Sequence, residues 1–140
     1  MSRRMARNAR RERGAAAVEF ALLLPLLLLL VFGLIDFGRA LNAQITLTQA
    51  AREGARLAAL GQTVAAVQSR TQTAATGLSS VSVTVTACPV GAGSGVNAVV
   101  TASYSFSFVT PINAIAGLFG SSGFGSTLTL TATGVMPCET

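Results

Sequence analysis

One uninterrupted apolar run near the N-terminus constrains this 140-residue chain more than any other feature. Residues 15–35 read AAAVEFALLLPLLLLLVFGLI, and Glu19 is the only charged side chain among them. At ~1.5 Å of rise per residue this stretch makes roughly 32 Å of helix, enough to cross a hydrocarbon core of about 30 Å. We therefore expect a transmembrane helix over residues 15–36, which leaves room for one small domain.

The basic charge of the chain is confined to the segment before this run. The net charge is +5, and residues 1–14 carry all of it, with six arginines against Glu12. Basic residues that flank a span stay on the cytoplasmic side, so we expect residues 1–14 inside and everything after Asp36 outside. Because no basic residue lies between Arg70 and the C-terminus, we expect no nucleic-acid surface on the domain.

The polar composition argues against catalysis. The chain has no histidine, so it lacks the commonest general base and the commonest metal ligand. Only 11% of its residues are charged. The domain shows neither paired carboxylates nor a Gly-rich phosphate loop after a strand. We therefore expect a protein that is not an enzyme and that uses no cofactor or metal.

Three interpretations of the apolar run compete. A secretory signal peptide needs small residues at a cleavage site, but the nearest candidate, Gly38-Arg39-Ala40, follows Asp36 and contains an Arg. An uncleaved signal anchor is the second interpretation. The third depends on Glu19, because a carboxylate costs about 2.5–3.5 kcal/mol near the centre of a membrane and less near its edge. Such a group is usually present for a partner.

Two short motifs carry a resemblance to a known family. Arg13-Gly14, followed by AAAVEF over residues 15–20, resembles the class III leader of the tight-adherence (Tad, or Flp) type IVb pilus system. That resemblance implies a prepilin peptidase that cuts between Gly14 and Ala15, and it makes Glu19 the fifth residue of the mature chain. The sequence AAREGAR, residues 50–56, resembles a stretch common in TadE-like proteins; its motif residues are Ala51, Arg52, Glu53, Gly54, Ala55 and Arg56.

The resemblance implies a function as well. It suggests a minor pseudopilin of the bacterial cytoplasmic membrane, with the prepilin peptidase, other pilins and TadE- or TadF-like pseudopilins as partners. In such assemblies Glu19 would pair with the free amine of Ala15 on a neighbouring subunit; the alternative is that Glu19 snorkels to the cytoplasmic interface. The alternative function is an uncleaved, membrane-anchored surface protein that binds an adhesive ligand.

Helical character continues beyond the membrane through the segment 37–77. Apolar residues at helical spacing predict that the first helix reaches about Leu60, and Pro25 predicts a kink within it. Residues 61–77 predict a turn and a short second helix. The helical spacing places seven apolar or small residues on one face of the long helix: Phe37, Leu41, Ile45, Ala51, Gly54, Ala55 and Ala58. The small members of this face would pack against the chain's own sheet or against another helix.

Residues 78–140 show the two-residue period of strands. Alternation predicts strands over residues 80–88, 96–108 and 127–135, with Gly91–Gly95 as a hairpin loop. Three antiparallel strands packed on a long helix make an α+β fold. Tyr104, Phe106 and Phe108 share a face with aliphatic residues, which favours a core role over an aromatic binding platform.

Two features of this β domain remain. Cys88 and Cys138 lie 50 positions apart with no neighbouring Cys or His, which excludes a zinc or redox motif and leaves a structural disulfide or two free thiols. We predict the disulfide, because the cysteines end the first and third strands in an oxidising exterior. The Gly- and Ser-rich loop 110–126 carries five large apolar side chains, which suggests either a partner contact or packing over the sheet edge.

Overall fold

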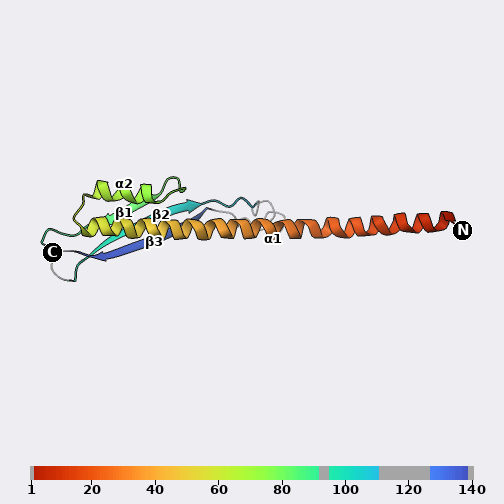
Figure 1. The fold of residues 1–140 in the computed structure, drawn as a ribbon, viewed down its shortest axis with the longest axis horizontal. Helices are drawn as coiled ribbons and strands as arrows, with labels where there is room; N and C mark the ends of the chain where they lie inside the picture. Colours follow the sequence, from red (N-terminus) through yellow and green to blue (C-terminus); the bar gives the residue numbers. More distant parts are fainter. Residues whose placement is uncertain (1, 92–94, 111–126, 139–140) are drawn as a thin grey trace.

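The computed structural model describes residues 2–91, 95–110 and 127–138, with side chains from residue 15 onward. A rod-like helix, α1 (Ser2–Ala59), runs the whole length of the molecule (Figure 1). A short helix, α2 (Val64–Ala74), and a three-stranded sheet cover only its C-terminal half. The N-terminus lies at the bare end of the rod and the C-terminus at the covered end. The α+β class expected from the sequence is confirmed.

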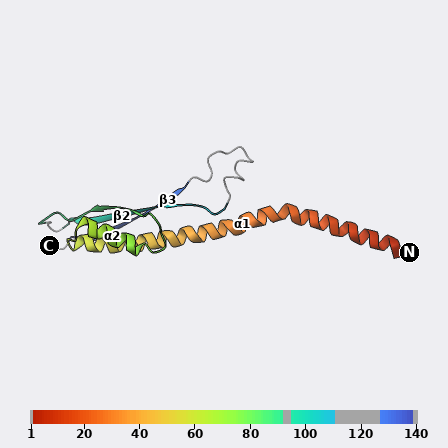
Figure 2. The ribbon, with the colours of Figure 1, turned by 90° about the horizontal axis from the view of Figure 1, so that it is seen from above.

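Helix α1 bends once and is followed by a glycine that closes its last turn. Figure 2 shows the bend in the orange-red part of the helix, the region of Pro25, which lacks a backbone N–H and crowds the preceding turn. At the other end Gly61 has φ +72°, the left-handed conformation that glycine adopts most easily. Gln62 N–H donates to Leu57 O (3.2 Å) and Gly61 N–H to Ala58 O (3.2 Å), which satisfies carbonyls of the last turn.

Helix α2 begins at a threonine cap. The Thr63 hydroxyl accepts a hydrogen bond from Ala66 N–H (3.3 Å), which satisfies one of the free donors of the first turn. The helix contacts both α1 and the first strand, and it buries Val67 and Thr71. The second helix predicted from residues 61–77 is therefore present.

The sheet consists of β1 (Ser82–Thr86), β2 (Asn97–Phe106) and β3 (Leu128–Pro137), in the order β1-β2-β3 with both neighbouring pairs antiparallel. Val83 lies opposite Ala102, and Ala102 lies opposite Ala132. Side chains alternate across a strand, so the even-numbered residues of β2 face α1 and the odd-numbered ones face away. All three predicted strands exist, each with bounds shifted by a few residues.

The core lies between the sheet and the C-terminal half of α1. Phe106 and Leu47 are its largest apolar side chains, and most of the rest are alanines. The small-residue face of α1 contacts the chain's own sheet, through β2 and β3, and also α2, so the first of the two packing alternatives left open by the sequence is found. The buried members of this face are Ala43, Leu47, Ala50, Ala51, Gly54, Ala55 and Ala58.

The prediction that Phe37, Leu41 and Ile45 belong to this covered face is wrong. These side chains are 63%, 49% and 58% exposed. Each step of four residues turns the position by about 40° around the helix, so the series drifts away from the sheet. Ala43 and Leu47 occupy the covered face instead.

The second predicted strand extends too far at both ends. Val96 and Phe108 lie outside β2 and are 37% and 38% exposed, so Phe108 is not a core residue as predicted. Its ring stands nearly perpendicular to the buried Phe106 ring, with 5.3 Å between the two centroids. The rest of the loop 110–126 beyond Thr110, with its apolar side chains, lies outside the described residues, as do residues 92–94 of the predicted hairpin loop.

Candidate functional site

The residues of the leader motif lie in an unbroken helix. Gly14 and Ala15 are both within α1, so the nitrogen of Ala15 is a peptide nitrogen in the intact chain. Glu19 is exposed on the helix surface, one turn beyond Ala15. The pairing expected for Glu19 therefore needs a free amine that only cleavage after Gly14 would create.

The AAREGAR motif lies at the opposite end of α1 and is a packing surface. Ala51, Gly54 and Ala55 are buried against the sheet and α2, whereas Arg52 and Arg56 are exposed. A Cβ added to Gly54 would lie 2.2 Å from the Thr71 hydroxyl oxygen and 3.1 Å from a methyl of Val100. Only glycine lets α1, α2 and β2 approach this closely.

Gly134 of β3 allows a second close approach to the same motif. A Cβ there would lie 2.2 Å from the backbone oxygen of Ala51. The small residues on α1 and this glycine on β3 therefore fit one another, although the sequence showed no link between them. The leader motif and the AAREGAR motif are not brought together: Glu19 and Ala51 are 32 residues apart on one helix, or roughly 48 Å.

Glu53 connects the two helices. Its carboxylate lies 3.6 Å from Arg56 Nε, three residues on in the same helix, and 3.5 Å from Arg70 Nε on α2. Both arginine side chains are more than half exposed, at 61% and 56%. Pairs this exposed contribute about 0–1 kcal/mol each, so they orient α2 more than they stabilise it.

Asp36 joins the end of the apolar run to the β domain, a role that the sequence analysis missed. The residue is 2% exposed. Its carboxylate accepts hydrogen bonds from Val109 N–H (3.0 Å), Thr110 N–H (2.8 Å) and the Thr110 hydroxyl, and it pairs with Arg39 Nη1 (2.9 Å). The chain that follows β2 is thus fixed to α1 at the first residue after the apolar run. The sequence offered one indication of this role: Asp36 and Arg39 are three residues apart, a spacing that allows an ion pair on one helix face.

Glutamines of α2 cover the outer edge of β1. Gln68 Nε2 donates to Val83 O (3.2 Å) and Gln72 Nε2 donates to Val81 O (3.2 Å). In the sheet order β1-β2-β3 the first strand is an edge strand, and α2 supplies these two donors to it and to the residue before it. On the opposite edge Gln44 of α1 donates to Thr131 O of β3 (3.0 Å).

A disulfide closes the domain. Cys88, just past β1, bonds to Cys138, just past β3, with the two Cα atoms 5.8 Å apart. The predicted disulfide is therefore present and links the two outer strands across the end of β2. Within the described residues, no three Cys, Asp or Glu side chains come close enough to hold a metal ion.

These features define a class of protein: a small disulfide-bonded α+β domain built on the end of one helix that is long and apolar enough to cross a membrane, with a mean hydropathy of 2.7 in its apolar window. Residues 14–56 match the family model described as TadE-like protein, which confirms the resemblance to the TadE-like family over this segment. No curated protein and no solved structure matches the chain. The family and the helix together fit a membrane protein associated with a Tad pilus.

Proposed function

We propose that the protein is a minor pseudopilin that helps to assemble a Tad (Flp, type IVb) pilus. In this proposal the apolar part of α1 anchors it in the bacterial cytoplasmic membrane as a single pass, with the N-terminus inside and the β domain outside. The observation that carries the proposal is the extent of the TadE-like match. It begins at Gly14, the residue of the proposed cleavage, and ends at Arg56, the last residue of the AAREGAR motif.

The fold supports a structural role rather than a catalytic one. The family segment contains the membrane-type helix and the small residues on which the domain packs, so its two ends serve anchoring and folding. Glu19, exposed in the apolar region, is the residue that we propose to pair with the Ala15 amine of a neighbouring pilin. A carboxylate and an amine at this depth would each offset the cost of the other's charge.

Processing after Gly14 is the first test. The full chain is expressed with and without a Tad prepilin peptidase, extracted from membranes and weighed by intact-mass spectrometry. We expect loss of residues 1–14 only when the peptidase is present, and full-length protein for the variant Gly14→Leu. A chain that stays full length beside an active peptidase would contradict the proposal and favour an uncleaved surface-binding protein.

The pairing of Glu19 needs a separate test. After cleavage, Glu19→Gln should reduce co-purification with the major pilin of the same system, because a neutral amide cannot offset the amine charge. Glu53→Gln is the matched control, since that carboxylate is distant from the membrane region and bonded within the domain. Equal recovery of pilin with Glu19→Gln and with the unaltered chain would show that Glu19 has no role in subunit pairing.

A further inference from the structure

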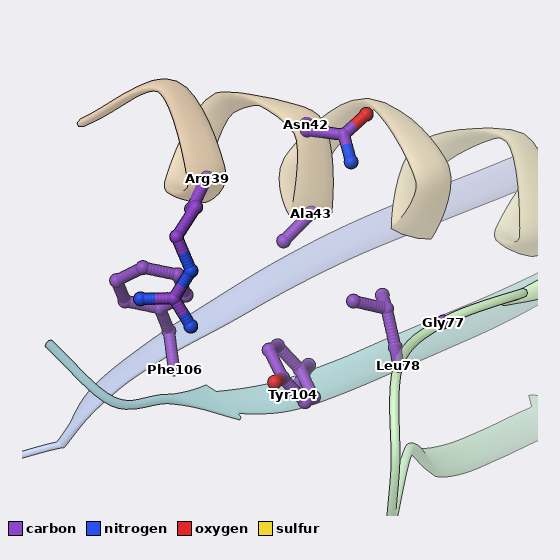
Figure 3. Close-up of a pocket in the computed structure, with 7 residues that line it drawn as sticks. All are labelled: Arg39, Asn42, Ala43, Gly77, Leu78, Tyr104 and Phe106. Carbon is purple, nitrogen blue, oxygen red and sulfur yellow. The ribbon is translucent and has the colours of Figure 1, made fainter. Parts of the chain in front are cut away.

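A cavity of about 150 Å³ lies between α1 and β2, at the end of the domain nearest the apolar run (Figure 3). Helix α1 contributes Arg39, Asn42 and Ala43, and β2 contributes Tyr104 and Phe106. The turn at Gly77 and Leu78 closes one side. The cavity thus combines a polar set, one guanidinium, one amide and one phenol, with an apolar floor.

Arg39 is held in a fixed orientation over this cavity. Its Nη1 donates to Asp36 Oδ1 (2.9 Å) and to Ser107 O (3.4 Å), and its Cζ lies 5.2 Å from the centre of the Phe106 ring. Figure 3 shows the guanidinium beside that ring and above the strand. Among residues 15–91, 95–110 and 127–138, no hydrogen bond engages Nε or Nη2, and 44% of the side chain is exposed. One edge of the guanidinium therefore presents two parallel donors.

The neighbouring carboxylate, that of Asp36, does not occupy this donor edge, because it bonds to Nη1 of Arg39. Asp36 already accepts hydrogen bonds from Val109 N–H, Thr110 N–H and the Thr110 hydroxyl, which lie on the side of the β domain. No carboxylate stands among the described residues that line the cavity. Paired N–H donors on a guanidinium match two oxygens of a phosphate group better than they match any neutral ligand.

The cavity also lies at a particular depth. Arg39 is four residues past Ile35, the last residue of the apolar run, which corresponds to ~6 Å along the helix. The headgroup layer of a bilayer extends roughly 5–8 Å beyond the hydrocarbon core on each side. If α1 crosses the membrane with its apolar run, the guanidinium edge is level with lipid phosphates.

We propose that this cavity binds the phosphate of a phospholipid headgroup, with the Nε and Nη2 edge of Arg39 on the phosphate oxygens. Asn42 and the Tyr104 hydroxyl add single donors, and the lipid glycerol lies against Leu78 and Phe106. This inference rests on the membrane anchoring in the proposed function but not on a role in the pilus. Bound lipid would fix the height of the domain above the membrane.

The chain offers its own probe, because Tyr104 is the single tyrosine and there is no tryptophan. Tyrosine emission of the full chain in an uncharged sugar detergent therefore reports this cavity. Short-chain phosphatidylglycerol should change the emission saturably, whereas diacylglycerol, which lacks the phosphate, should not. An equal response to diacylglycerol would overturn the phosphate assignment, and an equal response to inorganic phosphate would overturn the lipid one.

Variants at Arg39 test the geometry. Arg39→Lys can keep an ion pair with Asp36 but loses the paired donors, so we expect phosphatidylglycerol affinity to fall by at least about tenfold. Arg39→Gln should weaken binding further, with far-UV circular dichroism as the check on folding. Arg70→Gln, an exposed arginine on α2, should bind normally. Unchanged affinity in Arg39→Lys would overturn the proposal whatever the outcome of leader cleavage.

Discussion

The two halves of α1 differ in the size and the exposure of their side chains. The membrane half is the apolar run, residues 15–35, and the domain half is the part covered by the sheet, residues 43–59. In the membrane half, leucines are exposed over the whole circumference, as shown by Leu22 (74% exposed) and Leu30 (61%). In the domain half, the covered face is made almost entirely of alanine and glycine, with Leu47 as its one large side chain. One continuous helix thus has an apolar part with the exposed bulk of a membrane-spanning helix and a domain-facing part made of small residues.

The difference shows what each neighbour demands. Fluid lipid chains would adapt to any apolar surface, so a helix in a membrane needs no close steric fit to them at particular positions. A Cβ added to Gly33 would meet nothing within 4 Å, whereas one added to Gly54 would clash with Thr71. The domain half is therefore specified residue by residue, because the β3 backbone at Gly134 and the Thr71 side chain of α2 approach it closely.

The largest expected effect tests whether the domain half depends on its sheet. Replacing both Cys88 and Cys138 by Ser should destabilise the domain by about 4 kcal/mol in the chain-entropy model, because the closed loop is 50 residues long. Segment-resolved hydrogen exchange in detergent should show faster exchange over residues 43–59 and unchanged protection over residues 20–35. Equal loosening of both segments would show that the halves of α1 are coupled.

A smaller effect is expected from one methyl group on β3. Gly134→Ala should cost about 3 kcal/mol, because its Cβ would overlap the backbone of Ala51, which cannot move aside as a side chain can. Urea unfolding of the full chain, followed by circular dichroism, measures the loss. Gly33→Ala is the matched control in the membrane half and should leave domain stability unchanged; a comparable loss there would break the contrast.

Truncating one leucine in each half sharpens the comparison further. Leu47→Ala should cost about 2 kcal/mol or somewhat more, since Leu47 is fully buried in the domain core. Leu30→Ala removes the same atoms from a lipid-facing position and should not change the unfolding free energy of the domain. The same urea experiment serves both variants. If Leu47→Ala proved as harmless as Leu30→Ala, the core described here would be wrong.

The smallest effect concerns charge. Glu53→Gln removes both ion pairs that link Glu53 to Arg56 and Arg70, and it should cost less than about 1 kcal/mol, because both partners are largely exposed. Raising the salt concentration should reduce the stability of the unaltered chain toward that of the variant. A salt-independent difference between the two proteins would mean that Glu53 acts through packing instead.

The sequence was sufficient for features with a regular period. The apolar run, the alternation in the β domain and the two cysteines predicted α1, the three strands and the disulfide. It was insufficient where partners are distant in the chain. No local pattern around Gly134 predicts its close approach to Ala51, 83 positions away. Likewise, no local pattern around Asp36 predicts its hydrogen bonds to Thr110.

The assignment of Phe37, Leu41 and Ile45 failed for a different reason. Spacing alone identifies an apolar series, but it does not tell which of two series faces the sheet. The face that packs on the sheet is the one rich in alanine, because the sheet lies close to the helix. The candidate sites were recognised from their resemblance to the family, and the residues that position the domain against the membrane end of α1 were not.

The disulfide has a consequence for the covalent integrity of the molecule. Because Cys88 and Cys138 are joined, all the chain between them, including the loop 110–126, forms a closed ring. A protease that cuts one peptide bond within this ring opens it without releasing a fragment. A nicked protein would migrate as one band on a non-reducing gel and as two on a reducing gel, so both sides of the cut stay covalently joined to α1 for as long as the disulfide is intact.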